Sequence, residues 1–189
     1  MEKLYITAQE LLDDSFELAA RVLQSGFRPN FIIGIWRGGT PVGIAVQELM
    51  DYVGVTTDHI AIRTSSYTGI GAQSDEVLVH GLGYIVRNIN REDALLIVDD
   101  VFDSGRSVDA VIRDLTERTR RNCPHDIRIA TPWFKPKNNR TARVPDYYIH
   151  ETDKWLVFPH ELKGLTDTEI REGKGGVARV IESLADHLD

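Results

Sequence analysis

The most informative stretch of this chain is LLIVDDVFDSGRSVDAVI, residues 95–112. It begins within an apolar run, residues 94–98, that has the composition of a buried parallel strand and ends in two adjacent carboxylates, Asp99 and Asp100. A short loop with one glycine and two hydroxyl side chains then leads into a helix that begins near Arg106. Backbone N–H groups at a helix start bind anions, and carboxylates accept hydrogen bonds from sugar hydroxyls. The stretch therefore predicts a site for a sugar phosphate; the structural alternative is an ordinary polar turn capped by Asp.

The rest of the chain alternates between strand-like and helix-like patterns. A capping box at residues 7–10 begins a helix that ends near Gly26, and a second capping box at residues 166–169 predicts a helical tail. Apolar runs predict strands at 31–35, 59–63, 94–98, 127–134, 147–149 and 155–158, and helices are expected at 40–50 and 106–121. Glycine-rich residues 66–83 predict a long loop. Strands separated by helices indicate a mainly parallel sheet, which binds ligands at the carboxyl ends of its strands.

Length and composition limit the class of protein. The 189 residues suffice for about one domain, and 22 basic against 29 acidic residues give a net charge of −7. That charge disfavours broad binding to nucleic acid or to anionic membranes. Cys123 is the single cysteine, so the sequence excludes an internal disulfide framework and a multi-cysteine metal site. With no apolar run of membrane-spanning length and no signal-peptide pattern, we expect a cytoplasmic protein with no membrane partner.

The segment VDDVFDSGRS, residues 98–107, resembles the signature with which type I phosphoribosyltransferases bind phosphoribosyl pyrophosphate (PRPP). The resemblance extends over about residues 1–161. It implies an α/β fold with a mainly parallel twisted sheet flanked by helices, a small hood and a helical C-terminal tail. We expect one phosphoribosyltransferase domain over residues 1–189, with a hood from the N-terminal segment and residues 135–165. The tail, residues 162–189, is expected to cover the hood or to contact a subunit, with its helical part over residues 166–189.

In this resemblance the PRPP site comes from two strand ends. Asp99 and Asp100 would hold the ribose hydroxyls, and Asp103 would act near purine N7 as general acid or base. The loop that would cradle the 5-phosphate consists of Asp103, Ser104, Gly105, Arg106 and Ser107. The pyrophosphate loop, which in this family often contains a cis peptide bond, corresponds to Arg37, Gly38 and Gly39. Trp36 departs from the small residue expected before that loop, and a ligand contact and a core position are both open for it.

Two further features follow from this resemblance: a mobile loop like that of the 6-oxopurine enzymes, and a set of metal ligands. The start of a mobile loop, which closes over the reacting centre and excludes water, matches Ser65, Ser66 and Tyr67. The family uses Mg²⁺, and the residues that would hold it directly or through water are Asp99, Asp100 and Glu161.

The purine site in this resemblance lies in the C-terminal half. Lys135 matches the lysine that donates to the purine 6-oxo group, and Trp155 matches the aromatic residue that stacks on the base. Leu156 would bind the base edge through its backbone groups. Glu161 stands where the family usually has Asp, near the purine 2-substituent.

Together these resemblances predict a purine-salvage enzyme. It would transfer the 5-phosphoribosyl group from PRPP to hypoxanthine, guanine or xanthine, giving a nucleoside monophosphate and pyrophosphate. Its partners would be PRPP, the purine base and further copies of this chain in a dimer or tetramer, and nucleic acid would not be a partner. Two alternatives stay open: a regulatory protein on the same fold that senses PRPP or a nucleotide, and a phosphoribosyltransferase for another base.

Overall fold

The structure is a computed structural model that describes residues 2–67 and 76–184. The chain forms two compact units. We call residues 11–153 the sheet unit, and residues 1–10 together with 154–189 the terminal unit. Each unit is described by itself below.

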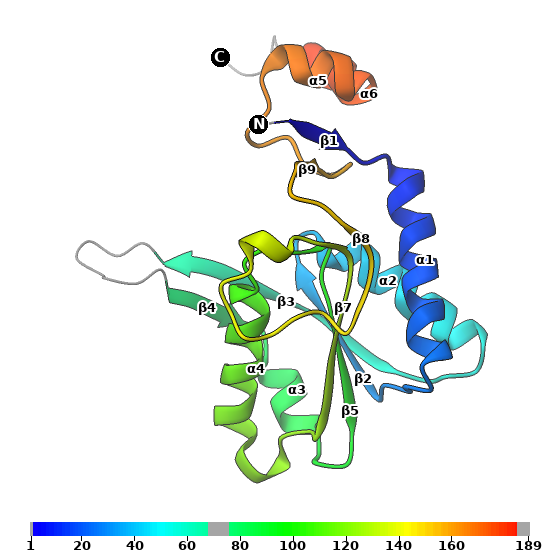
Figure 1. The fold of residues 1–189 in the computed structure, drawn as a ribbon, viewed down its shortest axis with the longest axis vertical. Coiled ribbons are helices and arrows are strands. Elements are labelled where there is room, and N and C mark those ends of the chain that lie inside the picture. The colour runs from blue at the N-terminus through cyan, green and yellow to red at the C-terminus, as the bar shows by residue number, and fades with distance from the viewer. Residues whose placement is uncertain (1, 68–75, 185–189) are drawn as a thin grey trace. The chain divides into compact units, whose positions relative to one another are not determined.

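A seven-stranded sheet forms the centre of the sheet unit (Figure 1). Its main path runs in the order β4-β3-β2-β5-β7-β6, and β8 also pairs with β7. The strands are β2 (Phe31–Trp36), β3 (Asp58–Tyr67), β4 (Glu76–His80), β5 (Ala94–Val98), β6 (Val101–Phe102), β7 (Asp126–Phe134) and β8 (Tyr147–Glu151). The β3–β4 pair is antiparallel, and the other described pairs of this sheet are parallel. The expected α/β fold with a mainly parallel sheet is confirmed.

Helices cover both faces of this sheet (Figure 1). They are α1 (Ala8–Gln24), α2 (Gly39–Tyr52), α3 (Gly83–Asn88) and α4 (Arg106–Thr119), with 3-10 turns at Arg120–Asn122 and Pro136–Asn138. Alternation along β2 assigns its side chains to the two faces. Phe31, Ile33 and Ile35 belong to a core cluster with α3 and α4. On the opposite face, Gly34 lies so close to α2 that a Cβ added at Gly43 would lie 3.6 Å from the Gly34 Cα.

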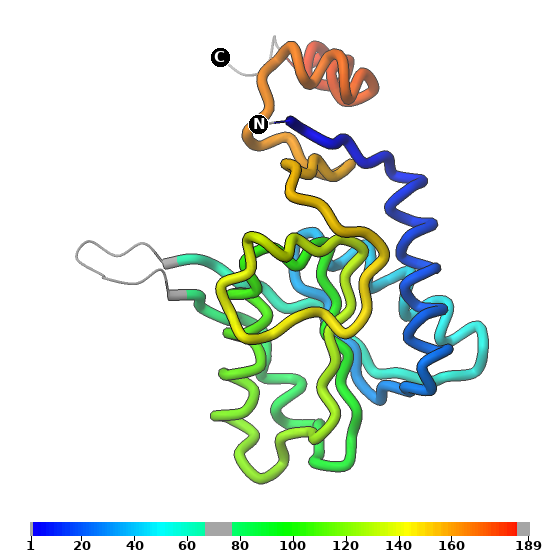
Figure 2. Tube along the Cα trace, viewed as in Figure 1, coloured from blue at the N-terminus to red at the C-terminus, as the bar shows by residue number. Residues whose placement is uncertain are grey.

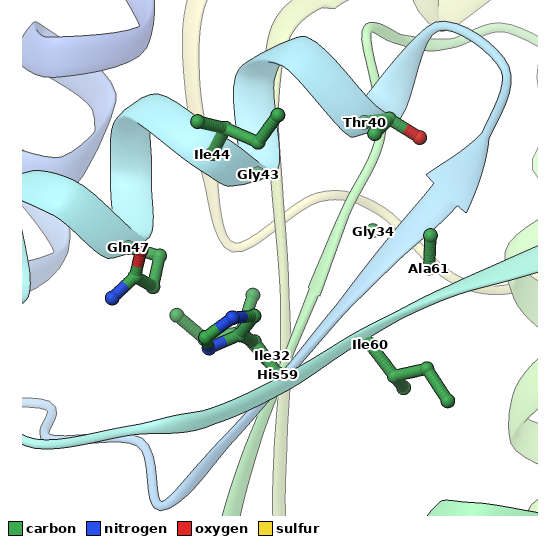
Figure 3. Close-up of a pocket in the computed structure, with 9 residues that line it drawn as sticks. All are labelled: Ile32, Gly34, Thr40, Gly43, Ile44, Gln47, His59, Ile60 and Ala61. Atoms are coloured by element: carbon green, nitrogen blue, oxygen red, sulfur yellow. The ribbon is translucent and has the colours of Figure 1, made fainter.

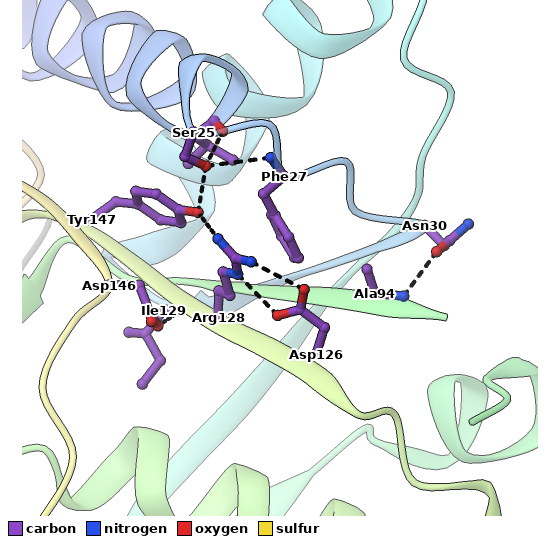
Figure 4. A network of polar contacts seen from close by, with 10 residues as sticks. Ser25, Phe27, Asn30, Ala94, Asp126, Arg128, Ile129, Asp146 and Tyr147 are labelled. Atoms are coloured by element: carbon purple, nitrogen blue, oxygen red, sulfur yellow. Dashed lines mark hydrogen bonds and ion pairs between the residues drawn. The ribbon is translucent and has the colours of Figure 1, made fainter. Parts of the chain in front are cut away.

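A polar cluster lies at the end of the sheet where β5 and β7 begin (Figure 4). We call Ser25, Asp126, Arg128 and Tyr147 the amino-end cluster. The Arg128 guanidinium donates to both Asp126 carboxylate oxygens, at 2.9 and 3.2 Å, and to the Tyr147 hydroxyl at 2.6 Å. Tyr147 in turn contacts the Ser25 hydroxyl at 2.7 Å, and Phe27 lies under the guanidinium at 4.4 Å. These contacts tie the end of α1 to β7 and β8.

The terminal unit has its own small sheet and two short helices. β1 (Lys3–Tyr5) pairs in parallel with β9 (Trp155–Val157), and α5 (Asp167–Gly173) and α6 (Gly175–Ser183) follow. The expected capping box at the start of α5 is present: the Thr166 side chain accepts from the Glu169 N–H, and Glu169 accepts from the Thr166 N–H. The helical tail is therefore confirmed.

Several boundaries differ from the sequence-based expectation. The helix expected from Thr40 begins at Gly39, and the loop expected over residues 66–83 is wrong at both ends. Residues 63–67 extend β3 and pair with residues 76–80, because antiparallel pairing satisfies the backbone of both segments. The short elements β1, β6 and α3 were not predicted, since two to six residues carry too little periodicity to detect. Of residues 135–165, which are expected to form the hood, residues 135–153 lie in the sheet unit and residues 154–165 in the terminal unit, and the hood itself stays a prediction.

Candidate functional site

Three polar segments follow the carboxyl ends of adjacent parallel strands. β2 pairs with β5, and β5 pairs with β7, with Gly34 opposite Val98 and Val98 opposite Ala130. The segments that leave these strands carry Arg37–Gly39, Asp99–Ser107 and Lys135 respectively. The sequence placed each segment at a strand end, and the strand order brings the three ends to one edge of the sheet.

The acidic pair lies directly after β5. The Asp99 N–H donates to the Ala130 carbonyl at 3.2 Å, which extends the β5–β7 pairing by one bond. One Asp99 carboxylate oxygen accepts from the Asp100 N–H at 3.0 Å, and the Gly39 N–H also donates to this carboxylate. Burial and the neighbouring Asp100 carboxylate nevertheless raise the pKa of Asp99 well above its usual range. The edge of the sheet therefore holds a concentration of negative charge that costs free energy when Asp99 is ionised.

The glycine loop after β2 packs on this acidic pair. The peptide bond between Trp36 and Arg37 is cis, as the resemblance implied. A Cβ at Gly38 would overlap the Asp100 carboxylate, at 1.6 Å from one oxygen, and a Cβ at Gly39 would lie 2.6 Å from the Val98 carbonyl oxygen. A side chain at Gly39 would therefore displace backbone, and one at Gly38 would displace the Asp100 carboxylate, in addition to blocking any approach of a ligand.

Trp36 is not a core residue. Its side chain is 54% exposed although it ends a strand whose preceding residues are buried. The interpretation of Trp36 as a core residue is therefore wrong, and the residue is exposed next to the glycine loop, residues 37–39.

The loop between β6 and α4 has the geometry of an anion site. Gly105 takes a φ of +75°, which favours glycine, and it immediately precedes the first residue of α4. The Arg106 N–H lies 3.4 Å from the Ser104 hydroxyl. A cavity of about 210 Å³ opens here, and its lining includes both carboxylates of the acidic pair together with Ser104, Gly105 and Ser107. One cavity therefore combines the sugar-binding and phosphate-binding chemistry that residues 95–112 predicted.

The segment between β7 and β8 crosses over the start of α4 (Figure 2). The Arg140 N–H donates to the Ser104 carbonyl at 2.9 Å. A Cβ added at Gly105 would lie 2.6 Å from the Thr141 hydroxyl oxygen. Arg143 pairs with Asp109 of α4 at 3.0 Å. Sequence reasoning missed this support of the loop between β6 and α4, although the basic residues of the segment were a visible signal.

Lys135 and Asp103 form an ion pair. β6 pairs with the end of β7, and the Lys135 N–H donates to the Phe102 carbonyl at 2.9 Å, which sets the two side chains beside each other. The Lys135 Nζ lies 3.4 Å from an Asp103 carboxylate oxygen, while the lysine is only 8% exposed. The sequence predicted a role for each residue separately and did not predict that they meet.

The end of β3 contacts the start of α4. The Thr64 hydroxyl lies 3.4 Å from the Ser107 hydroxyl, and Ser65 contacts His80 of β4 at 3.1 Å. Ser66 is exposed. Tyr67 is described only as the last residue of β3, and the loop that follows, residues 68–75, lies outside the described residues. Thr64 is a site neighbour that sequence reasoning missed, since a lone hydroxyl in a strand gives no signal.

The remaining predicted purine-site residues belong to the terminal unit. Trp155 is 46% exposed, with the Lys3 ammonium 5.9 Å from the centre of its ring. The Leu156 side chain is buried, so only its backbone groups remain for a ligand. A Glu161 carboxylate oxygen accepts from the Phe158 N–H at 3.3 Å.

A second cavity, of about 150 Å³, lies between α2 and the strands β2 and β3 (Figure 3). Its lining is mostly apolar, with Ile32, Ile44 and Ile60 among the contributors, and its one titratable side chain is His59. A phosphate requires cations or several N–H donors, which this lining does not supply. We therefore place the candidate site at the acidic pair and not here.

The predicted metal ligands are Asp99, Asp100 and Glu161. Within residues 2–67 and 76–184, no group of three or more His, Cys, Asp or Glu side chains is arranged to hold a metal ion. Asp99 and Asp100 belong to the sheet unit and Glu161 to the terminal unit. In the same described residues, no helix has the length and apolar composition needed to cross a membrane.

Comparison with known proteins gives one family and many similar structures. The family described as "phosphoribosyl transferase domain" matches residues 5–163. Comparison with curated protein sequences finds no match. A purine phosphoribosyltransferase from Pyrococcus horikoshii is 27% identical, with a TM-score of 0.67 over 88% of this chain and 99% of that one.

Two more distant structures share the fold. A xanthine-guanine-hypoxanthine phosphoribosyltransferase from Helicobacter pylori is 20% identical, with a TM-score of 0.61 over 83% of this chain and 92% of that one. A hypothetical protein from Neisseria gonorrhoeae, solved with bound ppGpp, is 18% identical, with a TM-score of 0.67 over 95% of this chain and 97% of that one.

Proposed function

This chain belongs to the phosphoribosyl transferase domain family and is an enzyme of the glycosyltransferase type, and we propose that its acceptor is a 6-oxopurine base. The reaction would take PRPP and hypoxanthine, guanine or xanthine and give the nucleoside monophosphate and pyrophosphate. The similarity to the Pyrococcus horikoshii purine phosphoribosyltransferase supports a purine acceptor. The preference for the 6-oxo group rests on residues of this chain.

The observation that carries the proposal is the ion pair between Lys135 and Asp103, with a separation of 3.4 Å. In a 6-oxopurine the O6 and N7 atoms lie next to each other on one edge of the ring system, where guanine presents them as two acceptors. Lys135 would donate to O6, and Asp103 would hold or release the proton at N7. Two side chains with these roles must be neighbours, and they are.

PRPP would occupy the cavity beside this pair. The α4 start and the hydroxyls of Ser104 and Ser107 would hold the 5-phosphate, since they combine N–H and O–H donors with the positive end of a helix dipole. Asp99 and Asp100 would accept from the ribose hydroxyls. Arg37, which follows the cis peptide bond, would bind the pyrophosphate as it leaves.

Mg²⁺ fits the acidic pair. Adjacent carboxylates together with phosphate and sugar oxygens are a donor set that Mg²⁺ accepts, and the ion would offset the burial and the repulsion from Asp100 that raise the pKa of Asp99. When bound, it would neutralise charge on the pyrophosphate and orient the substrate. Asp99 and Asp100 would hold it, and Glu161 stays a predicted third ligand.

The other predicted roles are carried over from the resemblance as separate proposals. Trp155 would stack on the base, which agrees with its exposed ring, and Leu156 would offer backbone groups. Ser65, Ser66 and Tyr67 would lead into a loop that excludes water during the reaction. A single domain, a cytoplasmic location and a homo-oligomer also stay predictions.

The test is pyrophosphate release from PRPP and Mg²⁺ with single bases. We expect release with at least one of hypoxanthine, guanine and xanthine, and none with orotate or uracil. Release with a pyrimidine alone would favour the alternative acceptor. Tight PRPP binding by calorimetry with no release for any base would favour the regulatory alternative and overturn the proposal.

A further inference from the structure

The C-terminal tail contains a lysine that contacts the predicted base-binding segment. Lys174 lies between α5 and α6, outside residues 5–163 that match the family. Its ammonium donates to the carbonyl oxygens of Phe158 and Pro159, the latter at 3.1 Å. Both acceptors immediately follow β9, the strand that carries Trp155 and Leu156. The tail is thus in direct contact with the continuation of that strand.

The segment that Lys174 contacts is a tight turn, residues 158–161. The Glu161 N–H donates to the Phe158 carbonyl at 3.0 Å, and a Glu161 carboxylate oxygen accepts from the Phe158 N–H at 3.3 Å. The rings of Phe158 and His160 stack at 5.7 Å with an angle of 8° between their planes. The Phe158 carbonyl therefore accepts two hydrogen bonds, one from the Glu161 N–H within the turn and one from the Lys174 ammonium outside it. The lysine thus adds a second donor to the carbonyl that holds the turn together.

The tail is held in place at several points. Lys3 of β1 pairs with Glu169 of α5 at 2.6 Å. A Cβ on Gly173 would lie 2.5 Å from the Tyr5 ring, so the end of α5 packs closely on β1. Lys174 follows that contact directly, and its backbone N–H donates to Ile170 at 2.8 Å. The backbone that presents the ammonium is therefore fixed before the side chain makes its bonds.

The ammonium is partly withdrawn from water. Burial lowers the pKa of Lys174, and the negative charge of Glu161 opposes that shift. A partly buried ammonium that donates to carbonyl oxygens near a carboxylate forms charge-assisted hydrogen bonds, which are stronger than neutral ones.

We propose that Lys174 is a positioning residue for base binding: it holds the turn at residues 158–161, and through it the Trp155–Leu156 end of β9, in the geometry that receives the purine. This inference rests on the proposed function. It assigns a role to Lys174 within the tail, for which the sequence suggested only a cover for the hood or a subunit contact.

The experiment compares three variants of the full chain. Lys174→Met removes the ammonium and keeps an unbranched side chain, and Lys174→Arg keeps a cation that can donate to both carbonyls. Lys163→Met removes the same charge at an exposed position for which the structure gives no side-chain bond among the described residues. Initial rates of pyrophosphate release are measured while the purine base and PRPP are varied separately.

We expect Lys174→Met to raise the KM for the base about tenfold, as loss of a charge-assisted hydrogen bond does, with the KM for PRPP within about twofold of wild type. Lys174→Arg should restore most of the difference, and Lys163→Met should match wild type. Equal base KM values for Lys174→Met and wild type, or an equal rise in both KM values, would overturn the positioning role.

A second measurement separates this proposal from the proposed function. Backbone hydrogen exchange at Phe158 and Glu161 should be faster in Lys174→Met than in wild type or Lys163→Met, because the turn loses its outer donor. If wild type releases no pyrophosphate with any base, the proposed function fails; unchanged exchange at these two residues overturns the positioning role whatever the activity.

Discussion

The two ends of the parallel strands β5 and β7 differ in whether their charged side chains are paired. Opposite charges meet at the amino end, and like charges meet at the carboxyl end. At the amino end, the Arg128 guanidinium is surrounded by acceptors, and its bonds to Asp126 raise the pKa of the arginine above its usual value. At the carboxyl end, Asp99 is buried beside a like charge, and its pKa rises because ionisation there is unfavourable. One end of β5 and β7 is arranged for stability, and the other is arranged at the expense of stability.

This difference is what the proposed function requires. A site that binds a polyanionic sugar and a cation must keep carboxylates and N–H donors available for them, so the protein cannot use those groups fully for its own structure. Substitutions of the charged side chains at the carboxyl end should therefore change activity more than stability, and those at the amino end the reverse, whereas substitutions of the packed glycines at the carboxyl end should change both. Four predictions test that contrast, in order of decreasing effect.

The largest effect is expected at Asp103. Asp103→Asn removes the group proposed to hold the proton at purine N7 and should lower kcat about 100-fold, with the KM for PRPP within about threefold. Asp114→Asn, which breaks an exposed pair with Arg118 on α4, is the control and should behave as wild type. Equal losses in kcat and in PRPP affinity for Asp103→Asn would contradict the role in proton transfer.

A substitution in the glycine loop, residues 37–39, tests whether close backbone packing at the carboxyl end is coupled to the binding of PRPP. Gly39→Ala forces a Cβ to 2.6 Å from the Val98 carbonyl oxygen and 2.8 Å from the Asp99 Cα, so backbone must move. We expect a loss of about 2 kcal/mol in the free energy of unfolding and a raised KM for PRPP. Gly43→Ala in α2, where the nearest atom is 3.6 Å away, is the control and should unfold in urea no earlier than wild type.

The amino-end cluster should affect stability alone. Arg128→Met removes the donor to Asp126 and Tyr147 and should lower the free energy of unfolding by about 1 kcal/mol, measured by urea denaturation. The KM values for PRPP and base and the kcat should not change at a temperature where the variant is folded. Arg113→Met, at an exposed position on α4, controls for the loss of charge. A change in kcat for Arg128→Met with an intact fold would remove the contrast between the two ends.

The smallest effect concerns pH and Asp99. Because the pKa of Asp99 is higher in the folded than in the unfolded chain, the folded chain binds more protons between these two values, and stability falls as pH rises through that window. Asp99→Asn carries no charge and should raise the Tm at pH 7, with a difference from wild type that shrinks towards pH 4. The same variant should raise the KM for PRPP. A Tm difference that does not depend on pH would show that the carboxylate carries no penalty.

The sequence predicted those parts of the site that lie within one short segment. Residues 98–107 hold the acidic pair, the glycine and the hydroxyls in a fixed order, and local chain geometry alone places them around one cavity. The capping boxes and the apolar runs of β2, β5 and β7 were equally local, and all were confirmed.

Contacts between distant segments were not predicted. The pairing of β6 with β7 sets Lys135 against Asp103, and the pairing of β3 with β4 makes strands of residues that were expected in a loop. Neither depends on local propensity, because each is decided by which strands become neighbours in the sheet.

Residue types along the chain thus determined the kind of fold and the chemistry of the phosphate loop, since strand and helix periodicity and the helix-start anion site are local properties. Tertiary structure alone decided that Gly38 and Gly39 pack on the acidic pair and that Lys174 contacts the turn after β9. It also decided that opposite charges meet at one end of the sheet and like charges at the other. The physical reason is that packing distances and the burial of charge depend on neighbours in space, which the order of residues does not reveal.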